Sequence, residues 1–155
     1  MNESKNGGEP FYAKGLQFEC LNCGRCCTGF PGYVYLSESD IARASEFLRV
    51  GKGEFVERYT RIVSVFHERR LSLTERKNFD CVFWKDGCTI YRARPYQCEA
   101  FPFWKRHLVS LREWEKTTST CGGIGRGRVH PRAEIERFAW EVPSYDIDAF
   151  TLPLG

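Results

Sequence analysis

The sequence predicts a small α+β domain in which helices pack beside short, irregular β-hairpin pieces. Its 155 residues are enough for one domain with a sizeable core. Several stretches between residues 37 and 142 repeat apolar residues at helical spacing. Two short strand-like runs flank Asp86-Gly87, and Asp-Gly between apolar runs strongly favours a hairpin.

The folded domain is expected to span residues 14–142. Residues 1–13 are mostly polar or glycine, with little to bury, and predict a flexible N-terminal tail. Residues 143–155 lack a usable periodicity and predict a C-terminal tail. No internal repeat or low-complexity segment divides the sequence.

Two helices are predicted in the first half. Ser37 and Asp40 match the S-x-x-D capping pattern of a helix start. Apolar residues recur on one face as far as Leu48, and Gly51 is predicted to end this helix. A second helix is predicted over residues 54–66, where apolar residues recur with a helical period.

Short strands are predicted at residues 33–36 and 70–74, and in the hairpin runs 81–84 and 88–91. The second half is then predicted to contain short helices and a loop. Pro95 is suited to the first position of a short helix that carries Cys98.

Two further helical segments and a loop are expected after this point. Ser110 opens a capping box that predicts one or two helical turns. The glycine-rich segment 121–127 predicts a loop, and residues 131–142 predict a last helix.

Composition excludes several classes of protein. With 42% hydrophobic and 28% charged residues, the chain is neither disordered nor collagen-like. It has no run of 18 apolar residues, so no membrane span is predicted. A net charge of +3 is too small to predict nucleic-acid binding. Residues 1–10 lack the apolar core of a secretory signal, so we expect a cytoplasmic protein.

The eight cysteines are the strongest chemical signal. Disulfides are rare in a reducing compartment, so eight thiols there favour metal or redox chemistry. Their spacing is Cys20-x2-Cys23-x2-Cys26-Cys27, Cys81-x6-Cys88-x9-Cys98 and Cys121. Soft thiolates at x2 spacing can share one ion and select zinc, copper(I) or iron–sulfur centres. We therefore predict a cysteine-ligated metal centre that joins the three blocks.

The spacing leaves the identity of the metal open. Three cysteines at x2 spacing with a distant fourth are typical of ferredoxin-like cluster ligands. Eight thiolates also fill two zinc sites of four cysteines each. Cys26 and Cys27 are adjacent, so they can serve two neighbouring centres or one cluster.

Other residues near the cysteines are predicted to have supporting roles. Arginines within a few residues of a cysteine are expected to offset thiolate charge: Arg25, Arg92, Arg94, Arg126 and Arg128. The histidines lack zinc-finger spacing and are expected in surface or capping roles: His67, His107 and His130. Asp40 is expected to close the capping box. The H-E-x-x-H, G-x-S-x-G and P-loop motifs are absent, so no enzyme class is predicted.

Three blocks of the sequence carry a family resemblance. They are Phe18-x-Cys20-x2-Cys23-Gly24-x-Cys26-Cys27, Cys81-x6-Cys88-x-Ile90-Tyr91-x2-Arg94-Pro95-x2-Cys98-x2-Phe101-Pro102, and Cys121-x-Gly123-Ile124-Gly125-x-Gly127. Together they resemble the YkgJ-type CxxCxxCC cysteine-cluster family, a zinc- or iron-chelating domain. The resemblance implies that all eight cysteines are metal ligands. Gly122 and Glu99 depart from the family pattern without removing a ligand.

The resemblance also bears on the choice of metal. A similar cysteine block occurs in flagellin lysine N-methylases, where it is associated with an iron–sulfur cluster. The favoured interpretation is therefore an iron-binding protein, with an iron–sulfur cluster, in a redox or catalytic accessory role. The alternative is a zinc-binding structural module that interacts with a protein partner.

Overall fold

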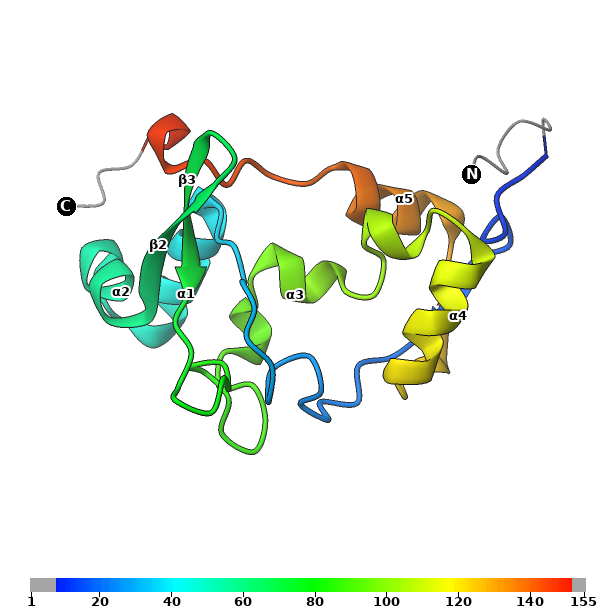
Figure 1. Cartoon of the computed structure of the whole chain (residues 1–155), viewed down its shortest axis with the longest axis horizontal. Helices are drawn as coiled ribbons and strands as arrows, with labels where there is room; N and C mark the ends of the chain where they lie inside the picture. The colour runs from blue at the N-terminus through cyan, green and yellow to red at the C-terminus, as the bar shows by residue number, and fades with distance from the viewer. Residues whose placement is uncertain (1–7, 152–155) are drawn as a thin grey trace. The chain divides into compact units, whose positions relative to one another are not determined.

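The computed structural model describes residues 8–151, and Figure 1 labels its α-helices and the strands β2 and β3. Among these residues the α-helices stand beside two small antiparallel sheets, so the α+β class is confirmed. The contacts group the described residues into two units. The first unit comprises residues 8–23 and 100–142, and the second comprises residues 24–99 and 143–151.

The second unit begins with the predicted capped helix. Helix α1 spans Glu38–Leu48. The Ser37 hydroxyl accepts a hydrogen bond from the Asp40 backbone N–H, and the Asp40 carboxylate accepts one from the Ser37 N–H. The capping box is confirmed, and each side chain satisfies a backbone donor that the helix cannot. Arg49 ends the helix in a left-handed conformation.

The second predicted helix is wrong beyond Tyr59. Helix α2 spans Lys52–Tyr59, and the chain continues directly into strand β2, Thr60–Val65. This strand pairs in antiparallel register with β3, Glu68–Leu73, which confirms the strand expected near residues 70–74. The β-branched residues of Thr60–Val65 fit a pleated strand, and β3 supplies the backbone partners that a helix would not use.

Two other strand predictions are wrong in extent. The segment 33–36 forms one bridge, between Tyr35 and Ser72, and no strand. The runs 81–84 and 88–91 meet only in a bridge between Trp84 and Cys88. The turn between them is tight, because Asp86 and Gly87 both have positive φ. This region therefore forms a compact loop, followed by η2 (Tyr91–Ala93) and α3 (Tyr96–Ala100).

A hydrophobic core joins the elements of the second unit. Phe55 of α2 is fully buried and stacks on Phe83, with ring centroids 6.2 Å apart. The other buried members are Leu36, Ile41, Ala44, Leu71, Leu73 and Ile90. Phe83 and Ile90 come from the cysteine-rich loop, so the core holds this loop against α2 and β3.

In the first unit, β1 (Leu16–Phe18) pairs antiparallel with β4 (Ile124–His130). The predicted loop 121–127 is therefore wrong from Ile124 onward. Gly125 and Gly127 both have positive φ, so a glycine-rich segment can bulge and still pair as a strand.

Three helices complete the first unit: η3 (Lys105–His107), α4 (Leu111–Thr120) and α5 (Arg132–Trp140). Helix α4 begins at the Ser110 cap and is longer than the one or two turns expected. The core is aromatic, with Trp114 stacked on Phe103. Tyr12 is buried in this core, although it lies in the segment expected to be a tail, whose residues 1–7 lie outside the described residues.

Part of the expected C-terminal tail packs on the second unit. Tyr145 is buried, Asp146 bridges to Arg70 of β3, and η4 follows at Ile147–Ala149. Within residues 8–151, no helix is long and apolar enough to cross a membrane.

Candidate metal centre

The cysteines are divided between the two units. The second unit holds five of them: Cys26, Cys27, Cys81, Cys88 and Cys98. The first unit holds Cys20, Cys23 and Cys121. None of the eight, all within the described residues, is in a disulfide.

A tight turn presents Cys26 and Cys27. The Gly24 carbonyl accepts hydrogen bonds from the Cys27 N–H at 3.0 Å and from the Thr28 hydroxyl at 2.8 Å. Gly24 is buried with φ +81°, a conformation that glycine adopts without strain. The Trp84 ring packs directly against it. The glycine inside the first cysteine block is therefore needed for both the turn and the contact.

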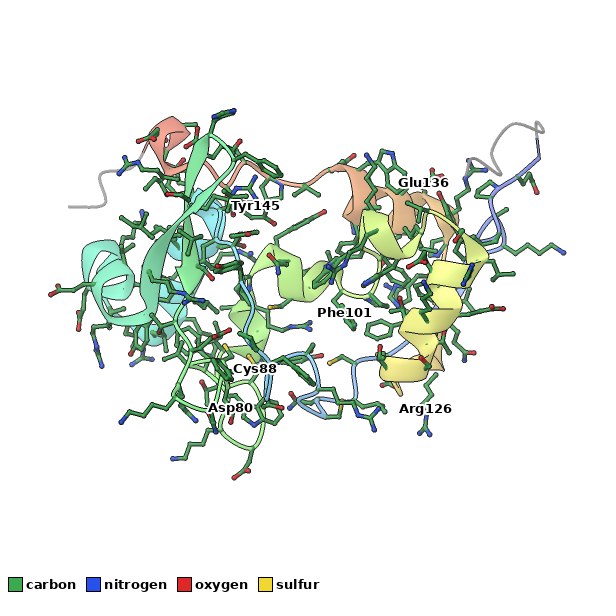
Figure 2. The ribbon with its side chains drawn as sticks, viewed as in Figure 1. Asp80, Cys88, Phe101, Arg126, Glu136 and Tyr145 are labelled. Carbon is green, nitrogen blue, oxygen red and sulfur yellow. The ribbon has the colours of Figure 1, made fainter. Side chains whose placement is uncertain are left out.

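A backbone contact joins this turn to the second cysteine block. The Cys81 N–H donates a hydrogen bond to the Cys27 carbonyl at 2.7 Å. The Asp80 carboxylate accepts one from the Gly29 N–H at 3.1 Å. Figure 2 labels Asp80 and Cys88 in this loop region. Residues more than 50 positions apart in the sequence are thus fixed side by side.

Helix α3 supplies the fifth thiol of the second unit. Its N-terminal residue, Tyr96, donates its backbone N–H to the buried Asp40 carboxylate at 2.9 Å. The Gln97 side chain accepts from the Tyr35 N–H and donates to the Tyr33 carbonyl. Cys98 is the next residue, so these bonds set where its thiol lies.

The Sγ atoms of Cys26 and Cys27 lie 3.8 Å apart, close enough for a hydrogen bond between them. The hydrogen bond from the Cys27 thiol lowers the pKa of Cys26 to about 7. The same bond, with burial, raises the pKa of Cys27. Their proximity thus favours the thiolate of Cys26 and the thiol of Cys27, and a bound cation would favour two thiolates.

The remaining thiols of this unit lie close enough to interact electrostatically. Burial raises the pKa of Cys98, and the charges of Cys81, Cys26 and Cys88 add to this. Burial also raises the pKa of Cys81. Five sulfurs in one partly buried region would repel each other as thiolates, so the region favours a positive partner.

Arginines supply part of that positive charge. Arg94 interacts electrostatically with Cys26 and Cys98 and favours the thiolate of each, although burial keeps the pKa of Cys98 raised. Its guanidinium lies 3.9 Å from the centroid of the Tyr91 ring. Arg76 was not among the predicted arginines, and it favours the thiolate of Cys81. Arg76 is five residues before Cys81 and outside the three blocks, so only its proximity in sequence could have indicated it.

The three cysteines of the first unit lie on two segments that meet. The Glu19 N–H donates to the Gly123 carbonyl at 3.0 Å, which brings the neighbourhoods of Cys20 and Cys121 together. A Cβ atom on Gly123 would lie 2.0 Å from the Glu19 carbonyl oxygen, so this approach requires glycine. Cys121 itself caps the C-terminus of α4.

His107 and His130 have partners other than the thiols. The ring nitrogens of His130 face Glu134 and the Phe18 carbonyl, and Nδ1 of His107 faces the Pro102 carbonyl. Arg128, expected near the thiols, pairs with Glu134 instead.

The donor set fits a soft metal in its chemistry. Five thiols in one unit match the ligands of zinc and iron–sulfur centres. Among residues 8–151, however, no three Cys, His, Asp or Glu side chains already converge as a metal-ligand set. The thiols are neighbours, and closing them around an ion requires side-chain rearrangement.

This α+β fold, with thiols gathered from separate sequence blocks, defines a cysteine-cluster protein. The chain belongs to the family described as "CxxCxxCC: Putative zinc- or iron-chelating domain", whose model matches residues 19–122. The family resemblance seen in the sequence is thereby confirmed, and a zinc- or iron-chelating role is the activity the family describes.

A relative was found among curated proteins, the uncharacterized protein MJ0939 of Methanocaldococcus jannaschii. It is 25% identical over 137 residues, which cover 79% of this chain and 42% of the relative. The chain therefore spans less than half of that protein's length. No solved structure matches the chain.

Proposed function

We propose that this protein binds iron through its cysteine thiolates, as an iron–sulfur cluster with a redox or catalytic accessory role. The observation that carries the proposal is the gathering of five thiols in the second unit from three separate segments. A closed tetrahedral zinc site uses four thiolates. Once rearranged around a cluster, five neighbouring thiols would supply four ligands and leave one thiol for exchange, which favours a reactive centre over a closed one.

The chain's own residues would hold such a centre in defined ways. Cys26, Cys27, Cys81, Cys88 and Cys98 each interact electrostatically with other thiols of this set. Arg76 and Arg94 offset part of the thiolate charge. A bound cluster would supply electron transfer, and Cys20, Cys23 and Cys121 of the first unit stay predicted ligands.

Elemental analysis tests the proposal. Protein purified without oxygen is assayed for iron, zinc and acid-labile sulfide per chain. About two or more irons with matching sulfide, and a visible spectrum bleached by dithionite, support the cluster. Zinc without sulfide would contradict it and support the structural, partner-binding alternative.

Single substitutions then locate the centre. Cys81→Ser and Cys98→Ser should each lower the metal content, whereas Ser64→Ala on the exposed face of β2 should not. Cys23→Ser in the first unit tests whether that unit also contributes ligands. Full retention of metal in Cys81→Ser and Cys98→Ser would exclude the second unit as the site.

A further inference from the structure

Helix α3, which carries Cys98, is too short to be stable by itself. It has five residues, and isolated helices below about 12 residues are marginal in water. Pro95 precedes it, is buried and presets its first turn, but it has no backbone N–H with which to donate a hydrogen bond. The position of the Cys98 thiol therefore depends on side chains that hold α3 from outside.

Asp40 is the main such anchor. Its side chain is 1% exposed, and both carboxylate oxygens accept hydrogen bonds. Oδ2 accepts from the Ser37 N–H at 2.8 Å, the start of α1. Oδ1 accepts from the Tyr96 N–H at 2.9 Å, the start of α3, and from the Arg43 guanidinium at 2.6 Å. One buried carboxylate thus caps two helices at once, and only one of the two was predicted by the capping-box pattern.

Gln97 is the second anchor, and its partners lie in the segment that precedes α1. Its Oε1 accepts from the Tyr35 N–H at 3.1 Å, and its Nε2 donates to the Tyr33 carbonyl at 2.8 Å. The two bonds occupy both polar ends of the amide, as a neighbouring strand would. The residue directly before Cys98 is therefore tied to the segment that leads into α1.

We propose that Asp40 and Gln97 are positioning residues of the thiol site, which hold α3 so that Cys98 faces the other cysteines of the second unit. The inference rests on the proposed function in one respect, namely that Cys98 binds the metal. Neither side chain is a ligand. Their effect is to keep a thiol from a five-residue helix in place without contact to the metal.

The test compares Asp40→Asn with Ser37→Ala. An asparagine has one oxygen, so it can cap α1 or α3 but not both. Ser37→Ala removes the other half of the capping box and weakens α1, yet it leaves the Asp40–Tyr96 bond intact. A role confined to capping α1 predicts the same result for both variants.

The readout is the iodoacetamide alkylation rate of each thiol in the reduced, metal-free full chain. Trypsin releases Cys81, Cys88 and Cys98 on separate peptides, because Lys85 and Arg92 lie between them. We expect Asp40→Asn to raise the rate of Cys98 relative to Cys81 by about tenfold, as the loss of one hydrogen bond to a buried charged group predicts. Ser37→Ala should leave this ratio unchanged.

A second variant protects the test against misfolding. Gln97 is only partly buried, so Gln97→Ala should fold and should also raise the Cys98 ratio. Equal acceleration of all three thiols in both variants, or a Cys98 ratio that stays at the wild-type value in both Asp40→Asn and Gln97→Ala, overturns the inference. Loss of metal to a chelator should also be faster in Asp40→Asn and Gln97→Ala than in Ser37→Ala. If the wild-type protein carries no metal, the proposed function fails and the alkylation ratios still decide this inference.

Discussion

The Trp84 ring occupies the space that a side chain on Gly24 would need. A Cβ atom built on Gly24 would lie 2.5 Å from the nearest ring carbon of Trp84, well inside van der Waals contact. Gly24 belongs to the first cysteine block and Trp84 to the second. The contact therefore helps to hold the Cys26–Cys27 turn against the segment that carries Cys81.

Gly24→Ala should both destabilise the protein and disturb this site. The left-handed backbone costs an alanine roughly 1–2 kcal/mol, and overpacking against Trp84 costs about 1–3 kcal/mol more. We expect a lower free energy of unfolding in urea, a changed near-ultraviolet circular dichroism spectrum and a reduced metal content.

Gly29→Ala is the matched control for this substitution. Gly29 has φ +82°, nearly the same as Gly24, but nothing lies within 4 Å of a Cβ atom there. Gly29→Ala should therefore show the backbone cost alone and keep its metal. Equal destabilisation and equal metal loss in the two variants would show that the Trp84 contact is unimportant.

Removal of bound metal should lower the thermal midpoint of the wild-type protein. A ligand that binds only the folded chain adds its binding free energy to stability. The same chelator should leave Cys81→Ser nearly unchanged, because that variant should already lack the metal. Calorimetry with and without chelator measures both effects. An identical wild-type midpoint in the two conditions would show that the centre does not stabilise the fold.

Local signals in the sequence were sufficient for some elements and insufficient for others. The Ser37–Asp40 capping box depends on four consecutive residues, so the start of α1 could be predicted correctly. The segment 60–65 has an apolar pattern compatible with either a helix or a strand. Its conformation is decided by pairing with residues 68–73, a tertiary contact that periodicity does not contain.

The same division applies to the candidate site. Cysteine type and spacing predict soft-metal chemistry, because those are properties of the donor atoms. The grouping of five cysteines in one unit depends on how the chain folds back: Cys26, Cys27, Cys81, Cys88 and Cys98. The boundary between the units lies between Cys23 and Cys26, and their x2 spacing gives no sign of it. The bond from Tyr96 to Asp40 spans 56 positions and has no local pattern at all.

Phe66→Gly should stabilise the protein. Phe66 is the first residue of the two-residue turn between β2 and β3, with φ 55° and 96% of its surface exposed. Glycine removes the left-handed strain of roughly 1–2 kcal/mol and loses almost no burial. Its greater loss of backbone entropy on folding destabilises the protein by about 0.5–1 kcal/mol. We expect a gain of up to about 1 kcal/mol in urea unfolding.

His67→Gly controls for the neighbouring turn position. Phe66 has a positive φ, and His67 does not. Glycine at His67 relieves no strain and should cost about 0.5–1 kcal/mol. A similar loss of stability in Phe66→Gly would mean that the backbone at Phe66 is not strained.

Glu134 should make a pH-dependent contribution to the stability of the first unit. Hydrogen bonds from Arg128, and to a lesser extent from His130, lower the pKa of Glu134 to about 2. Because the pKa is lower in the folded protein, this stabilisation is complete above about pH 4.5 and is lost as the pH falls toward 2. Glu134→Gln should therefore cost about 1–2 kcal/mol at pH 6, after allowance for solvent screening around the exposed Arg128.

Urea unfolding of wild type and Glu134→Gln at pH 6 and pH 3 measures this dependence. The difference between the two proteins should fall by about half at pH 3, as the folded-state pKa requires. Glu113→Gln is the control, since its partner Lys116 is exposed and surface pairs of this kind contribute little. A difference for Glu134→Gln that stays constant between the two pH values, or one matched by Glu113→Gln, would place the contribution of Glu134 in packing rather than in its charge.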